Sequence, residues 1–397
     1  MRRFLSFATL TNVALIGFSL FGCQIDSSVE PTSIAADCLV KASSTNGTAI
    51  AGSYIVTYRP ALAVSSSPNA RLASSEAQVE QFLTDAEVVN SQAEVLATGD
   101  QTSFLAHLSE SESQKLQQDP AVLLIEPDQI MSMCNCVDVT TTTTLPWNIS
   151  QTGYGRGDLQ TTKTAWIIDT GIDLDHPDLN VDVSRSKSFV SGVTSADDEN
   201  GHGTHVAGII GAKNNSIGVT GIASGATLVS LRVLDDEGEG RLSGIIQAIN
   251  YVRQNGKAGD VVNLSLGGES TSTTLDQAIT QAANAGILFA IAAGNDSKNA
   301  DNYSPSRVNN ANVFTVSAMD SRNQFASFSN FGSSVDVCAY GVRITSTYMG
   351  GKYAILSGTS MAAPHVAGLL FIRGNTFPKH GTVTGDPDGT PDPMAGE

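Results

Sequence analysis

The sequence predicts an α/β fold, a mainly parallel sheet with helices on both faces, preceded by a small α+β domain. Beyond residue 145, short and continuously apolar segments alternate with helical ones, which is typical of parallel strands buried on both faces. Upstream, polar and apolar residues alternate along the chain, as they do in half-buried strands. A chain of 397 residues is also long enough for two domains.

The net charge of the chain indicates which classes of binding partner are unfavourable. Acidic residues outnumber basic ones 39 to 22, which gives a formal charge of −17. Nucleic acids and anionic membranes are bound through basic patches. The composition therefore disfavours both as partners and fits a soluble exported protein.

The first residues are typical of an export signal. Arg2 and Arg3 precede an apolar stretch that predicts a signal peptide over residues 1–22. A membrane anchor is the alternative, because about 20 apolar residues can cross a bilayer. Polar residues within the stretch favour the signal peptide. Residues 20–23 also resemble the lipobox of bacterial lipoproteins, so the sequence leaves two locations open: secretion, or an outer-surface or periplasmic lipoprotein with lipid on Cys23.

Export would affect whether the cysteines form disulfides. If Cys23 carries lipid, an even number of cysteines remains, and an oxidising compartment favours disulfides. Four cysteines allow three pairings, and the sequence does not choose among them. The close spacing of two of them, without histidine partners, does not suit a zinc site. The four are Cys38, Cys134, Cys136 and Cys338.

The small domain is predicted at 51–133, after a Ser/Thr/Ala-rich linker at 23–50. Ser109 and Glu112 have the spacing of a capping box, so a helix begins there and ends at Asp119 before a proline. The other expected elements are strands at 53–58, 103–108 and 122–126 and a helix at 77–88.

The larger domain is predicted at 146–376. A polar segment at 134–145 precedes it, and an acidic tail at 377–397 follows it. The expected strands are 163–168, 227–233, 260–266, 287–292 and 313–318, and the expected helices are 203–211, 243–255, 275–285 and 360–372. In such a sheet, reactive side chains belong at strand ends and helix starts.

Three residues in that position supply an acid, a base and a nucleophile. Asp169 follows an apolar strand, His202 precedes a helix in a glycine-rich segment, and Ser360 begins another helix. A serine hydroxyl becomes nucleophilic when a base removes its proton, and a buried acid must orient that base. The order Asp, His, Ser and the flanking residues resemble the subtilisin-like serine proteases (subtilases) over residues 147–373.

Simpler explanations exist for each residue taken alone. Asp169 could be a turn residue, and Ser360 could be a helix N-cap. Capping does not explain the segment 364–368, which extends the family signature. His205 lies one helical turn after His202, but the glutamate of a His-Glu-x-x-His zinc site is absent, so we expect a packing role.

The resemblance implies further site residues. Asn295 matches the residue that donates its side-chain amide to the oxyanion of the tetrahedral intermediate. Two segments match the edges that bind an extended peptide through main-chain hydrogen bonds. We expect broad endopeptidase activity, with an apolar or aromatic preference before the cut. The implied groove residues are Gly238, Gly240, Ser265, Leu266, Gly267, Ala292 and Gly294.

The resemblance also implies a structural Ca²⁺. This hard cation takes six to eight oxygen ligands, many of them carbonyls. A solvated, Asn-rich turn is the alternative interpretation, and the acidic segment 385–389 could hold another ion or be disordered. The implied ligands are Asp178, Lys213, Asn215, Ile217 and Val219.

The small domain is similar to the inhibitory propeptide of subtilases. An unrelated α+β binding domain is the alternative. The resemblance implies that this domain assists folding, inhibits the active site and is removed by self-cleavage within 134–145. The sequence thus predicts a monomeric zymogen that hydrolyses proteins and peptides. The rival hypothesis is a subtilase-fold protein that is non-catalytic or acts only on its own propeptide.

Overall fold

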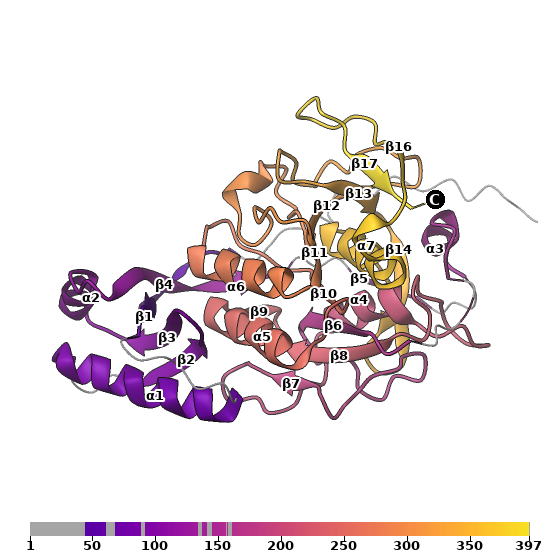
Figure 1. Cartoon of the computed structure of the whole chain (residues 1–397). Coiled ribbons are helices and arrows are strands. Elements are labelled where there is room, and N and C mark those ends of the chain that lie inside the picture. The colour runs from indigo at the N-terminus through magenta and orange to yellow at the C-terminus, as the bar shows by residue number, and fades with distance from the viewer. Residues whose placement is uncertain are drawn as a thin grey trace, which may run out of the picture. The chain divides into compact units, whose positions relative to one another are not determined.

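The computed structural model describes residues 44–60, 68–88, 92–133, 137–140, 145–155, 157 and 161–396 (Figure 1). The predicted signal peptide and all cysteines except Cys338 lie outside these ranges. Within them, no helix combines the length and the apolar character that crossing a membrane requires.

A nine-stranded sheet is the centre of the larger domain, residues 145–396, in the order β16-β17-β13-β12-β11-β10-β6-β8-β7. Every neighbouring pair except β16–β17 is parallel, as predicted. The strands are β6 (Thr164–Asp169), β7 (Lys187–Ser188), β8 (Thr227–Arg232), β10 (Val261–Leu264), β11 (Leu288–Ala292), β12 (Val313–Met319), β13 (Val337–Tyr340), β16 (Lys379–Thr382) and β17 (Pro393–Ala395).

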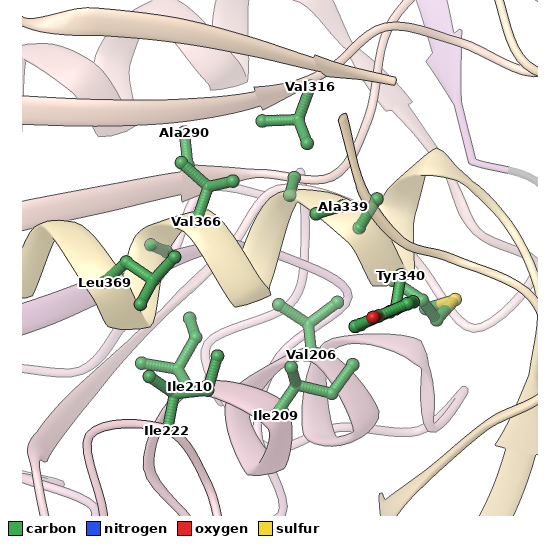
Figure 2. Close-up of a cluster of buried hydrophobic side chains, with 14 of the residues drawn as sticks. Val206, Ile209, Ile210, Ile222, Ala290, Val316, Ala339, Tyr340, Val366 and Leu369 are labelled. Carbon is green, nitrogen blue, oxygen red and sulfur yellow. The ribbon is translucent and has the colours of Figure 1, made fainter. Parts of the chain in front are cut away.

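Helices cover both faces of this sheet. Successive strand residues point to opposite faces, so Ile167 and Ile168 of β6 join different apolar clusters. The cluster of Ile167 contains residues of α4 (His202–Gly211) and α7 (Thr359–Arg373), and Figure 2 shows part of it. The cluster of Ile168 contains residues of α5 (Leu242–Asn255) and α6 (Thr273–Asn284).

The larger domain also has shorter elements, and β5 from the preceding segment, predicted at 134–145, pairs with one of them. β14 (Ile344–Tyr348), β15 (Lys352–Leu356) and β5 (Val137–Thr140) form a three-stranded antiparallel sheet. The remaining elements are α3 (Trp147–Gln151), the 3-10 helices η1 (Ala300–Asn302) and η2 (Gly374–Thr376), and β9 (Glu239–Arg241).

The upstream domain, residues 44–133, is an antiparallel sheet in the order β2-β3-β1-β4, to which β9 adds a fifth strand. The capping box of Ser109 and Glu112 is present, as predicted. The elements are β1 (Ala49–Tyr58), α1 (Pro68–Asp85), β2 (Ala93–Ala97), β3 (Thr102–His107), α2 (Glu110–Gln117) and β4 (Val122–Ser132).

The linker predicted at 23–50 ends too late. Ala49 already belongs to β1, and the N–H of Gly47 donates to the carbonyl of Ile130 at 2.8 Å. Pairing between β1 and β4 shifts register between Ala49 and Tyr54. This irregularity breaks the period-two alternation that would have revealed the strand.

The acidic segment 377–397, predicted as a tail after the larger domain, belongs to the fold of that domain as far as residue 396. Met394 of β17 pairs with Cys338 of β13, and the side chains of Phe377 and Val383 are buried. The hydroxyl of Ser317 donates to the carboxylate of Asp392 at 2.6 Å. The sequence window looks polar because its few core residues are separated by an acidic loop.

The disulfide prediction fails for Cys338. Its thiol is free, and the residue is fully buried in β13. Burial raises the pKa of this thiol well above its ordinary value. The thiol therefore behaves as a small apolar group of the core.

Candidate active site

Asp169 and His202 meet where β6 ends and α4 begins. Nδ1 of His202 lies 2.7 Å from Oδ1 of Asp169, and both side chains are fully buried. The same carboxylate oxygen accepts the N–H of Thr170 at 2.8 Å. A Cβ at Gly203 would collide with the carbonyl of Gly171, so glycine allows the helix to start this close to the strand end.

Ser360 lies in the first turn of α7, which packs against α4. Its hydroxyl donates to the carbonyl of Ser265 at 3.1 Å. Nε2 of His202 and Oδ2 of Asp169 are buried without a hydrogen-bond partner among the described residues. The structure thus joins the acid to the base directly and leaves the base with a free nitrogen.

Asn295 follows the end of β11 and faces α7. Its Oδ1 accepts from the backbone N–H and the hydroxyl of Thr359 at 2.8 and 2.9 Å. Because the oxygen is used in this way, the amide NH₂ remains as the donor end of the side chain. Asn295 and Ser360 line the same pocket.

The pocket collects most of the predicted groove. Of the seven groove residues, Gly238 and Gly240 are not in its lining; Gly240 pairs with β4 through β9, and the carbonyl of Gly238 accepts the N–H of Met133 at 3.2 Å. Sequence reasoning missed Asp296 and Tyr303, which carry no distinctive motif. The lining is Asn46, Ser132, Met133, Ser265, Leu266, Gly267, Ala292, Ala293, Gly294, Asn295, Asp296, Tyr303, Pro305, Ser306, Thr359 and Ser360.

The end of β4 lies between two edges of the larger domain. Met131 is opposite Gly240 on one edge, and Ser132 forms a bridge with Gly267 on the other. Ser132 and Met133 then reach the pocket that contains Ser360. The upstream domain therefore occupies the predicted peptide groove as an added strand.

Two carboxylates of β4 hold it at helix starts. Glu126 accepts the hydroxyl of Ser272 at 2.7 Å at the start of α6. Asp128 accepts the N–H and the hydroxyl of Ser243 at 3.0 and 2.9 Å in the first turn of α5. Burial raises the pKa of Asp128. Both positions favour negative charge, because backbone N–H groups are unpaired there.

Of the residues predicted to bind Ca²⁺, Lys213, Asn215 and Val219 hydrogen-bond to Asp178, which is fully buried, and the N–H of Ile217 donates to the side chain of Asn215. Its carboxylate accepts from Nδ2 of Asn215 at 2.8 Å and from the N–H of Val219 at 2.9 Å. A Cβ at Gly218 would collide with this carboxylate. Among the described residues, no three His, Cys, Asp or Glu side chains form a metal group. The carboxylate of Asp178 and the amide oxygen of Asn215 are oxygen ligands of the kind that a hard cation takes.

His205 packs in the core. Its Nε2 lies 3.0 and 3.1 Å from the carbonyls of Ile344 and Ala354. Burial lowers the pKa of His205 to about 3, so the ring is neutral at physiological pH.

Comparisons with known proteins show the family. A family model described as "Subtilase family" matches residues 165–382. The chain is 42% identical to a thermostable alkaline protease of Halalkalibacterium halodurans over 279 residues, 69% of this chain and 73% of that protein. It is 46% identical to subtilisin BL of Lederbergia lenta over 228 residues, 56% and 82% of the two chains.

A solved structure gives the same result. The crystal structure of a cold adapted subtilisin-like serine proteinase matches with a TM-score of 0.55 and 35% identity, over 63% of this chain and 97% of that one. The chain therefore belongs to the subtilase family and is a serine endopeptidase.

Proposed function

We propose that the chain is made as an exported, self-inhibited precursor whose larger domain hydrolyses peptide bonds with Asp169, His202, Ser360 and Asn295. The observation that carries the proposal is the end of β4, which lies as an added strand beside the pocket of Ser360. An inhibitory segment that imitates a bound peptide has this geometry.

In the proposed mechanism, Ser360 exchanges its bond to Ser265 for one to Nε2 of His202. Its oxygen attacks the substrate carbonyl carbon while His202 takes the hydroxyl proton. Asp169 orients the ring and stabilises its positive charge. The amide of Asn295 and the N–H of Ser360 hold the oxyanion, and His202 then protonates the leaving amine. Water repeats the sequence on the acyl-enzyme and releases the second product.

The groove supports broad specificity. Recognition through the backbone edges at Gly240 and Gly267 constrains the substrate sequence little. We expect an apolar or aromatic residue before the cut, a monomeric enzyme, and self-cleavage within 134–145. Residues 1–22 would direct export, and Cys23 would carry lipid if the precursor is a lipoprotein.

We also propose that Asp178, Asn215 and the carbonyls of Lys213, Ile217 and Val219 hold a structural Ca²⁺. In this arrangement the amide nitrogen of Asn215 faces the carboxylate, so its oxygen would have to turn toward the ion. The ion would offset the buried negative charge. Chelation should lower the melting temperature of the wild-type enzyme and leave Asp178→Asn unchanged; an equal response of both proteins would contradict the site.

The proposed function is tested with Ser360→Ala in the full chain. The variant should remain uncut, whereas the wild type should release a mature protein with a new N-terminus within 134–145, visible by intact mass. Wild-type enzyme should digest casein and be labelled by a fluorophosphonate at Ser360. Self-cleavage by the purified variant would refute the assignment, and cleavage without casein digestion would support the rival that acts only on its own propeptide.

A further inference from the structure

We propose that Asp198 is a positioning residue that fixes Asp169 and His202 relative to one another. This inference rests on the proposed roles of those two residues. Asp198 is 7% exposed and lies four positions before His202, in the segment that leads into α4.

The carboxylate of Asp198 joins the end of β6 to the start of α4. Its Oδ1 accepts from the hydroxyl of Thr170 at 2.9 Å and from the N–H groups of Asn200 and Gly201 at 3.0 and 2.9 Å. Its Oδ2 accepts from the N–H and the hydroxyl of Thr204 at 2.9 and 2.5 Å. Five donors therefore converge on one buried side chain.

These donors come from both sides of the acid–base pair. Thr170 follows Asp169 directly and donates its N–H to that carboxylate. The hydroxyl of Thr170 also accepts the N–H of Gly203, the residue after His202, at 3.0 Å. The hydrogen bonds thus form a closed ring that passes through Asp169 and His202 and is bridged by Asp198.

Asp198 shares the capping of this helix start with two neighbours: Asn200 accepts the N–H of His202 at 3.2 Å, and Thr170 accepts that of Gly203. The N-cap residue of α4 is Gly201, which has no side-chain cap, so the carboxylate of Asp198 accepts backbone N–H groups there instead. Burial raises the pKa of Asp198, and the five donors favour its ionised form. A carboxylate at a helix start is also favoured by the helix dipole. The same group that begins the helix therefore sets the position of the catalytic ring.

Positioning predicts an effect on turnover rather than on substrate binding. A displacement of about 1 Å in a catalytic group costs on the order of 100-fold in rate. Asp198→Ala removes the whole bridge, so kcat should fall about 100-fold, and Asp198→Asn, which keeps one acceptor, about 10-fold. KM should stay within about twofold, because Asp198 and Thr170 do not line the pocket.

Thr170 provides a second and milder set of variants. Thr170→Val removes the hydroxyl that joins Asp198 to Gly203 and should lower kcat about 10-fold. Thr170→Ser keeps the hydroxyl and should have the kcat of the wild type. The double variant Asp198→Asn with Thr170→Val should lose about as much as either single variant, because both break one bridge. Asp197→Asn is the matched control: it removes the neighbouring exposed charge and should leave kcat unchanged.

The experiment measures kcat and KM on a soluble peptide anilide with enzyme recovered from expression of the full chain. Fluorophosphonate titration gives the concentration of active sites, and the melting temperature reports folding. Wild-type kcat per active site in Asp198→Asn and Thr170→Val, with only a lower melting temperature, would overturn the inference. If Ser360→Ala or His202→Ala were instead active, the proposed function itself would fail.

Discussion

The two domains bury their sheets in different ways. The nine-stranded sheet of the larger domain has its own helices on both faces. The upstream sheet has its own helices on one face only: Val56 and Phe104 pack with Leu116 of α2. Their neighbours Ile55 and Leu105, on the opposite face, belong instead to the apolar cluster of α5 and α6.

This difference indicates how the upstream domain depends on the larger one. A sheet gains stability from covering both faces, because buried apolar area is the main favourable contribution. Here the second face of the upstream sheet is covered by α5 and α6 of the larger domain, the surface along which β4 runs to the pocket. Folding of the upstream domain and occupation of the groove are therefore coupled through the same contacts.

The largest expected effect is a loss of turnover, because the catalytic groups lie in the larger domain. Asn295→Ala should lower kcat roughly 100- to 1,000-fold with little change in KM, because it removes one oxyanion donor. The check is steady-state kinetics on a peptide anilide with titrated active sites. Lys257→Ala, on an exposed lysine of the larger domain, is the control and should leave kcat unchanged. A raised KM with unchanged kcat would show instead that Asn295 contributes to substrate binding and not to transition-state stabilisation.

Matched core substitutions sharpen the comparison. Phe104 and Phe289 are both fully buried, one in each domain. Replacing a buried phenylalanine with alanine costs about 3–5 kcal/mol. We expect Phe104→Ala to unfold the upstream domain of the uncut chain, because its own core is small, and Phe289→Ala to leave that domain folded. Hydrogen exchange resolved by peptide would measure this, and equal loss of protection in both domains with either variant would contradict it.

A third substitution weakens the contact between the domains. Asp128→Ala removes two hydrogen bonds at the start of α5, worth about 1–3 kcal/mol together, so the cut upstream domain should inhibit roughly 5- to 150-fold less tightly. Inhibition of casein digestion by the cut segment provides the measurement. Glu80→Ala, exposed on α1, is the control and should inhibit as the wild type does. Unchanged inhibition by Asp128→Ala would show that the contact contributes nothing.

The last effect concerns how the stability of the larger domain depends on pH. Burial raises the pKa of Asp392 to about 7, and the nearby Asp386, Asp388 and Asp336 add to the shift. Between about pH 4 and pH 7, the folded state therefore binds more protons than the unfolded state. The free energy of unfolding falls as the pH rises through this range. Asp392→Asn cannot ionise, so at pH 8 it should be more stable by about 1–4 kcal/mol.

Thermal unfolding at several pH values would measure this difference. The gap between variant and wild type should narrow as the pH falls and close below about pH 4, where the wild-type carboxyl becomes protonated in the unfolded state as well. Two curves that stay parallel across the range would contradict the raised pKa.

Sequence reasoning succeeded where local patterns are strong. Continuous apolar strands predicted the parallel sheet, and the resemblance of the three motifs to the subtilases implied that Asp169 pairs with His202. β2 was missed, and the helix predicted at 77–88 begins at 68. These elements have short or weakly periodic sequences, and their positions depend on packing.

Other features depend on contacts distant in sequence. Nothing near Asp198 reveals that Thr170 will donate to it, and nothing near Cys338 reveals that β17 will pair beside it. Glu126 and Asp128 look like ordinary solvated charges until the fold places them at helix starts of the other domain. Such roles depend on tertiary structure, which a local reading does not supply.

The strand in the groove also has a consequence for timing. While β4 is joined to the larger domain, the effective local concentration of this segment is that of a tethered ligand, on the order of millimolar for a short linker. Once the chain is cut beyond Met133, the segment is present only at the concentration of the enzyme itself. If the chain is exported and cut as proposed, dilution would release the cut segment from the groove, so the enzyme would become active only where it is dilute.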